Sequence, residues 1–198
     1  MHKTLLKFWV ILTFFNLSVA EGGAQANFFD RLADSAYTLT KQQVVYDPQY
    51  FVLKYPNGDV PANKGVCTDV VIRAYRKLGI DLQKEVHQDM SSHFNAYPKS
   101  WGLSRPDKNI DHRRVPNLMT YFKRQGSSIA ISTVASDYFP GDIVCWNLGG
   151  AVTHIGIVSH LKSNDGLRPL IIHNIGAGQV LEDCLFSFRI IGHYRFRK

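Results

Sequence analysis

The chain lacks a long hydrophobic run. Its longest apolar stretch, Phe8–Ala20, has 13 residues, whereas a membrane-spanning helix needs about 20. Two lysines precede this stretch and small residues close it, which is the pattern of an export signal. We therefore expect residues 1–26 to be a signal peptide, cleaved after Ala20 or after Ala26. An exported protein, periplasmic or secreted, with no stable membrane insertion should remain.

Cysteine is also scarce, with Cys67, Cys145 and Cys184 as the three in the chain. None lies near a candidate cleavage point, which argues against a lipid anchor on a processed N-terminal cysteine. An odd number of cysteines in an oxidising compartment leaves at least one unpaired within the chain. Cys145 and Cys184 could form a disulfide, which would leave Cys67 as the free thiol. The sequence alone does not establish that bond.

Acidic residues are outnumbered, 16 against 23 lysines and arginines, which gives a formal net charge of +7. There is no nucleic-acid-binding motif, no internal repeat and no low-complexity segment. In an exported protein, the positive charge suits anionic envelope polymers such as peptidoglycan, or it serves solubility alone. Removal of the signal leaves 198 − 26 = 172 residues, the size of one domain, residues 27–198.

The hydrophobic periodicity changes along the chain. A helical period predicts helices first, and a period of two then predicts strands. The expected helices are 28–45, 65–79, 81–96 and 115–125, and the expected strands are 142–147, 153–160, 169–174 and 188–196. Helices followed by antiparallel strands indicate an α+β domain, with the helices packed on one side of the sheet.

Cys67 opens the helix GVCTDVVIRAYRKLG, on an apolar stripe that must face the sheet. Taken alone, a cysteine on such a stripe is usually a packing residue. Its place in the first turn favours a reactive thiol, because the helix dipole stabilises a thiolate and lowers the pKa of the thiol. On the same helix, Asp69 is expected to pair with Arg73 one turn later.

A histidine, His154, begins the alternating strand THIGIVSH. Gly156, two residues later on the same face, should let another element approach closely, and the Cys67 helix is the expected one. A hairpin loop near residue 164 would bring His173 or Asn174 of LIIHN beside His154. Cys67, His154 and this third residue would then form a nucleophile, base and orienter series.

A metal site is the competing interpretation of the histidines, because His154, His160, His173 and His193 all lie on expected strands. No pair of them has the short spacing that is typical of a zinc site. We therefore expect neither a metal nor a cofactor.

These segments resemble a known family. The Cys67 helix, the turn and strand PGDIVCWNL, then THIGIVSH and IIHN, are similar to the papain-like NlpC-type cysteine peptidases. More closely, residues 46–196 resemble an uncharacterised bacterial family typified by YijF. The shared runs are GVCTDVVIRAYRKLG, NIDHRRVPNL and FPGDIVCWNL.

The NlpC-type resemblance implies a papain-like fold and an envelope amidohydrolase that cuts amide bonds of peptidoglycan peptides. It makes Cys67 the nucleophile, His154 the general base and His173 the orienter. Tyr55, twelve positions before Cys67, matches a family tyrosine that helps to hold the oxyanion. An ordinary half-buried tyrosine is the plain alternative for Tyr55.

The chain also departs from the NlpC-type pattern. Val66 and Asp69 stand where that pattern has aspartate and glycine, and residues 80–127 form an insert without a counterpart. Arg113 and Arg114 in this insert are candidate clamps for substrate carboxylates. The interpretation that we favour for them is an exposed charged loop or an internal ion-pair cluster. Asp142 is expected to fix the PGD turn.

Two other functions remain open at the level of the sequence. A binding module could keep the fold without turnover and recognise envelope glycan or peptide through the basic insert. A thiol acyltransferase could use the same Cys67–His154 pair and form an amide with an added amine.

Overall fold

The computed structural model describes the backbone of residues 20–198 and the side chains of residues 28–198. The expected signal segment therefore lies largely outside the described residues. No helix in the described part of the chain is long and apolar enough to cross a membrane.

The helices come first along the chain. They are α1 (Ala20–Leu39), α2 (Cys67–Lys77), α3 (Leu82–Ser92) and α4 (Val115–Arg124). The helix expected over 28–45 instead begins at Ala20 and ends at Leu39, and Val45–Tyr46 forms a short strand, β1, parallel to β2 (Lys64–Gly65). Pro116 in the first turn of α4 suits a helix start, because its missing N–H would be unpaired there.

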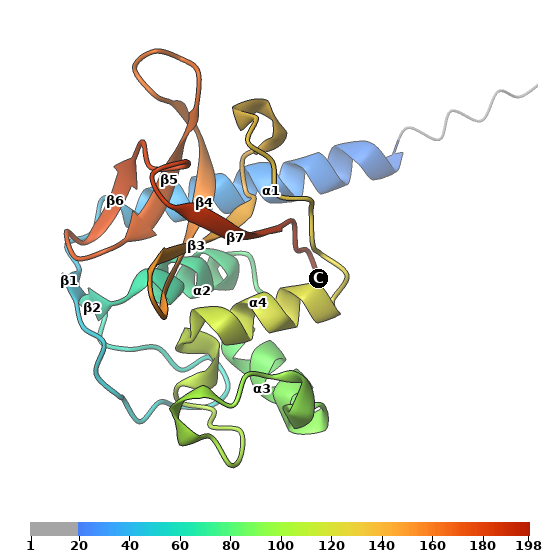
Figure 1. Ribbon diagram of the computed structural model, residues 1–198, viewed down its shortest axis with the longest axis vertical. Coiled ribbons are helices and arrows are strands. Elements are labelled where there is room, and N and C mark those ends of the chain that lie inside the picture. The colour runs from blue at the N-terminus through green and yellow to red at the C-terminus, as the bar shows by residue number, and fades with distance from the viewer. Residues whose placement is uncertain (1–19) are drawn as a thin grey trace, which may run out of the picture.

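A five-stranded antiparallel sheet follows, in the order β6-β5-β4-β3-β7. Its strands are β3 (Ile143–Gly149), β4 (Val152–Lys162), β5 (Pro169–Asn174), β6 (Gln179–Glu182) and β7 (Arg189–Tyr194). The observed α+β architecture agrees with the expected class, and β6 is the strand of this sheet that the sequence did not predict. Figure 1 shows the sheet in the upper part of the view, with α2, α4 and α3 below it.

Buried apolar side chains form two clusters, one on each face of the sheet. The larger cluster joins α1, α2 and α4 to inward residues of the sheet such as Cys145, Ile155 and Ile172. The smaller cluster contains Trp146 and Cys184. Cys145 and Cys184 are thus free, buried cysteines in different clusters, and the suggested disulfide is not formed.

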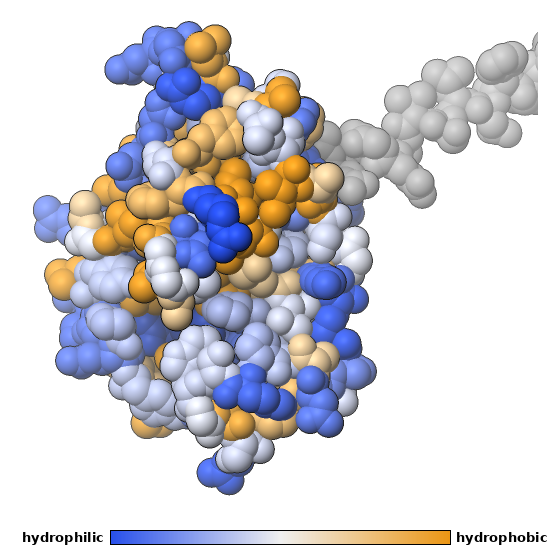
Figure 2. Space-filling view, in the orientation of Figure 1, coloured by the Kyte–Doolittle hydropathy of each residue, from blue (hydrophilic) through white to orange (hydrophobic). Residues whose placement is uncertain are grey.

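Part of the outer face stays apolar. Figure 2 shows hydrophobic residues gathered over the sheet region around β7, while the helical region below is mostly hydrophilic. Ile131, Phe186 and Phe188 are exposed large apolar residues that line a shallow hollow beside Arg189. The described residues leave these side chains uncovered.

Candidate functional site

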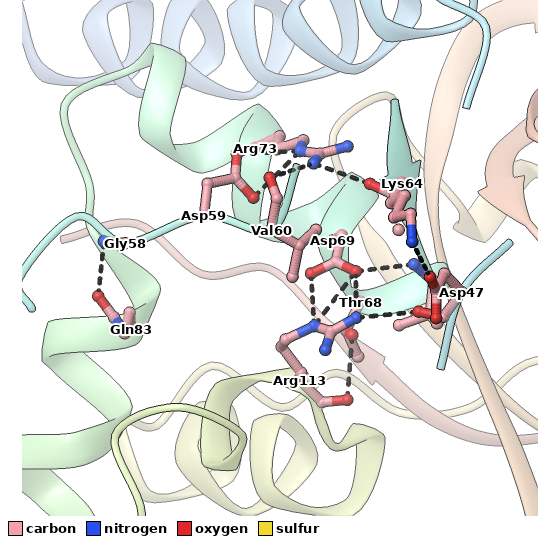
Figure 3. Close-up of polar contacts among 12 residues, drawn as sticks. Asp47, Gly58, Asp59, Val60, Lys64, Thr68, Asp69, Arg73, Gln83 and Arg113 are labelled. Atoms are coloured by element: carbon pink, nitrogen blue, oxygen red, sulfur yellow. Dashed lines mark hydrogen bonds and ion pairs between the residues drawn. The ribbon is translucent and has the colours of Figure 1, made fainter. Parts of the chain in front are cut away.

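Cys67 occupies the first position of α2, and its position is fixed by buried polar contacts. The Asp69 carboxylate accepts a hydrogen bond from the backbone N–H of Val66 at 2.7 Å, which caps the start of the helix. The Arg113 guanidinium binds the same carboxylate, with Nε to Oδ1 and Nη2 to Oδ2 both at 3.0 Å (Figure 3). The side chains of Arg113 and Asp69 are 1% and 3% exposed, so this is a buried ion pair.

One prediction about this region is therefore wrong, and one candidate role does not hold. Asp69 does not pair with Arg73, because Arg73 instead binds Asp59, with Nε 3.0 Å from Oδ2. Arg113 is not available to a substrate, since its guanidinium also donates to the carbonyls of Asp47 and Gln49. It forms an internal ion-pair cluster, which is part of the interpretation favoured for it from the sequence.

The sulfur of Cys67 lies beside the peptide that joins His154 to Ile155. The backbone N–H groups of Ile155 and Thr68 lower the pKa of this thiol, against the larger effect of burial. Strand pairing between β4 and β5 ends at Ile157 opposite Ile172, two residues short of Ile155. The structure brings the start of the helix to the start of the histidine strand, as the sequence predicted. The side chain of that strand that packs with Cys67 is Ile155, however, whereas the His154 ring packs on Trp146 at the opposite face of the sheet.

The protonation of this thiol differs from the expectation. Burial raises the pKa of Cys67 to about 12, and the N–H group of Ile155 acts in the opposite direction. The loss of hydration outweighs the helix dipole because Cys67 is only 6% exposed. Cys67 is thus a neutral thiol at pH 7 in this state. Among the described residues, no hydrogen bond joins it to the His154 ring.

His154 belongs to a chain of hydrogen bonds that continues across the sheet. Its Nε2 lies 2.9 Å from Nδ1 of His173, and Nε2 of His173 lies 2.9 Å from Oε2 of Glu182. His154 and His173 are 4% and 1% exposed. Burial, followed by the neighbouring His173, lowers the pKa of His154 to about 3, so its ring is neutral at pH 7.

This series of hydrogen bonds determines the tautomers of the His154 and His173 rings. An ionised carboxylate only accepts hydrogen bonds, so Glu182 places a proton on Nε2 of His173. Nδ1 of His173 then accepts from the Nε2–H of His154, and a neutral His154 must carry its lone pair on Nδ1. The arrangement leaves the ring of His154 ready to take a proton at Nδ1.

The geometry shows which of the two candidates for the third residue contacts His154. His173 contacts His154, whereas the Nδ2 of Asn174 donates to the carbonyl of Gly65 at 3.3 Å, just before the Cys67 helix. Gly156 does allow a close approach, but the approaching element is β5 rather than α2. A Cβ at Gly156 would lie 2.6 Å from Cγ2 of Ile171 and 3.2 Å from Cβ of His173.

Glu182 was missed from the sequence. It lies on β6, where Ile171 pairs with Glu182 and His173 with Val180. The usable signal was the glycine-rich turn at Gly176 and Gly178, which makes IIHN and QVLE a hairpin with His173 and Glu182 on one face.

A cavity of about 480 Å³ opens beside Cys67, within the size range of small-ligand sites. Its lining residues include Cys67, Tyr46, Tyr50, Trp101, Arg114 and Thr153. Tyr55 is not among them, because its ring packs against His87 with centroids 5.2 Å apart. The tyrosine beside the thiol is Tyr46, whose pKa is raised by burial and then by the charge of an ionised Cys67.

Arg113 and Arg114 both line this cavity, and Arg114 is the one outside the ion pair with Asp69. Its guanidinium stacks on Trp101, with the central carbon 4.4 Å from the ring centroid. Nη1 lies 3.8 Å from the Asp111 carboxylate, and this atom is buried without a hydrogen-bond partner among the described residues. Unlike Arg113, Arg114 has donors left for a ligand.

Asp142 fixes its turn, as predicted. Its Oδ2 accepts from the backbone N–H of Phe139 at 2.9 Å and pairs with Nε2 of His193 at 2.8 Å. His193 is therefore a partner of Asp142. His160 lies apart from the hydrogen-bonded series of His154, His173 and Glu182, which we call the relay. Its Nε2 is 3.4 Å from Oδ1 of Asp34.

Comparison of the sequence with known proteins places this chain in a family. The family model described as a domain of unknown function, DUF1287, matches residues 33–196. The chain belongs to the DUF1287 family. It is 53% identical over 172 residues to the uncharacterized protein YijF of Escherichia coli (strain K12), covering 87% of this chain and 83% of that protein. No solved structure matches.

Proposed function

We propose that this member of the DUF1287 family is an exported cysteine amidohydrolase, with Cys67 as the nucleophile and His154 as the general base. The observation that carries the proposal is the hydrogen-bonded series from His154 through His173 to Glu182, which places a lone pair on Nδ1 of His154. The position of the Cys67 sulfur against the His154–Ile155 peptide supports it further.

The proposed reaction starts when a substrate amide enters the cavity. Cys67 attacks the carbonyl carbon while Nδ1 of His154 takes the thiol proton. In this proposal, the backbone N–H of Cys67 and the hydroxyl of Tyr46, both residues that line the cavity, stabilise the oxyanion. The amine leaves with the proton from His154, and water then hydrolyses the thioester. The His154 ring packs against Trp146 on the face of the sheet opposite Cys67. The proposed proton transfer therefore requires the start of β4 to turn this ring towards the sulfur in the substrate complex.

We propose peptides of peptidoglycan as the substrate class. Stem peptides carry free carboxylates, and Arg114 lines the cavity with one guanidinium nitrogen, Nη1, that has no hydrogen-bond partner among the described residues. Trp101 would keep that guanidinium in place by stacking. No metal or cofactor takes part in the proposed steps, and a periplasmic or secreted location is part of the proposal.

The test is digestion of purified peptidoglycan, with the fragments identified by mass. The parent protein is expected to release fragments with new amine and carboxyl ends, and Cys67→Ala should release none. Cys145→Ala is the matched control, because it removes a buried thiol outside the cavity. Digestion by Cys67→Ala at the parent's rate would exclude the mechanism.

A binding module without turnover is the second candidate, and the neutral, buried state of Cys67 favours it. For a binding module, Cys67→Ala should bind soluble stem peptides as tightly as the parent, and neither protein should cleave them. Arg114→Met should weaken this binding in either case.

A further inference from the structure

A second cluster of reactive side chains lies at the far end of the histidine series. His173, Glu182 and Cys184 each offer one ligand atom, and these atoms all lie within 4.8 Å of one another. The sulfur of Cys184 is 3.6 Å from Nε2 of His173, the atom that is also 2.9 Å from Glu182. The Cys184 thiol has no part in the proposed hydrolysis.

The spacing of these three atoms suits a metal ion with tetrahedral coordination. Bonds of about 2.3 Å from zinc to sulfur and about 2.05 Å to nitrogen place the two ligand atoms about 3.6 Å apart. The corresponding separation of a nitrogen and an oxygen ligand is about 3.3 Å, so a small movement of the Glu182 carboxylate would complete the set. The Glu182 side chain is 54% exposed, which gives an ion a route in and leaves a coordination position for water.

We infer that His173, Glu182 and Cys184 form a binding site for a borderline-soft divalent cation of the Zn²⁺ type. Thiolate, imidazole and carboxylate together match this class better than Mg²⁺ or Ca²⁺, which prefer oxygen ligands. Binding releases the proton of the Cys184 thiol, because the metal ligand is the thiolate.

Metal binding at this site exchanges the tautomers of His173 and His154. The consequence of this change for activity rests on the proposed function. A metal on Nε2 of His173 leaves the proton of the neutral ring on Nδ1, which then donates to Nε2 of His154. His154 in turn carries its proton on Nδ1. Each ring keeps one proton, but the lone pair that would accept the Cys67 proton is gone. The metal site therefore acts as an off switch for the hydrolase.

The binding test uses the metal-free mature protein and Zn²⁺, followed by calorimetry and by the ultraviolet thiolate band with Cd²⁺ as a second probe. One equivalent should bind to the parent and to Cys67→Ser. Cys184→Ala should bind at least tenfold more weakly and lose the band, and urea unfolding checks that this variant is folded. Equal binding by Cys184→Ala, or no binding by the parent, would overturn the site.

The switch is tested separately by nitrogen NMR of the histidine rings. Zn²⁺ should move the His154 proton from Nε2 to Nδ1 in the parent but not in Cys184→Ala. Unchanged tautomers at full occupancy would overturn the switch, whether or not the protein is a hydrolase. If hydrolysis is observed, Zn²⁺ should inhibit the parent reversibly and leave the rate of Cys184→Ala at that variant's own metal-free value.

Discussion

Replacing Arg113 by methionine tests the buried ion pair that supports the Cys67 helix. The Arg113 side chain is 1% exposed and its partner Asp69 is 3% exposed. Methionine fills much of the space but donates no hydrogen bond. The Asp69 carboxylate would keep only the N–H of Val66. Removal of one member of a buried ion pair costs about 3–5 kcal/mol, because the remaining charge is left uncompensated.

Urea denaturation of the mature protein measures this cost. With an m-value of about 2 kcal/mol/M, a loss of 3–5 kcal/mol lowers the midpoint by about 2 M. Arg114→Met is the neighbouring control, and it should cost about 1 kcal/mol or less because that guanidinium is half-buried and lacks a close carboxylate partner.

A double variant separates the ion pair from the loss of packing. Asp69→Asn keeps an oxygen for the Val66 N–H and removes the charge. Combined with Arg113→Met, it should restore about 1–3 kcal/mol relative to Arg113→Met alone. A loss below 1 kcal/mol for Arg113→Met, or equal losses for Arg113→Met and Arg114→Met, would refute this reasoning.

Three further predictions concern the relay. Gly156→Ala should cost about 1–3 kcal/mol in unfolding free energy and lower kcat, because its Cβ would meet Ile171 and press on His173; a stable, fully active variant would contradict this. Glu182→Gln should lower kcat on a soluble stem peptide about fivefold, which corresponds to about 1 kcal/mol for a hydrogen bond screened by solvent; an unchanged kcat would show that the carboxylate does not set the tautomer. The pKa of His154, lowered to about 3 from 6.5, should keep kcat/KM level from pH 7 to pH 5, and a midpoint near 6.5 would contradict the neutral relay. The same shift makes stability contributed by His154 present above pH 6.5 and lost as the pH falls towards 3.

The strands that carry the histidines were predictable because their signal is local. Alternation of apolar and polar residues located β5 at Pro169–Asn174 and located β3 and β4 to within two residues. The start of α2 followed in the same way from its amphipathic stripe. These features depend on neighbours along the chain, and that is the information that a periodicity contains.

The rest of the site depends on contacts between distant segments. Arg113 and Asp69 are 44 positions apart, and nothing in either local pattern distinguishes this pair from the nearer Asp69–Arg73 pair. Tyr46 reaches the cavity from the short strand β1 and Trp101 from a short 3-10 helix, Ser100–Gly102, so their positions follow from the packed domain. Burial reversed the expected pKa shift of Cys67 because the helix dipole can be inferred from sequence, whereas the loss of hydration cannot.

The most direct test of the hydrolase proposal is acid-quenched mass spectrometry of the protein during reaction with a soluble stem peptide. We predict an acyl group bound as a thioester on the peptide that contains Cys67, and none in Cys67→Ala. Continued cleavage by Cys67→Ala, or an acyl group on Cys184 instead, would contradict the role given to Cys67.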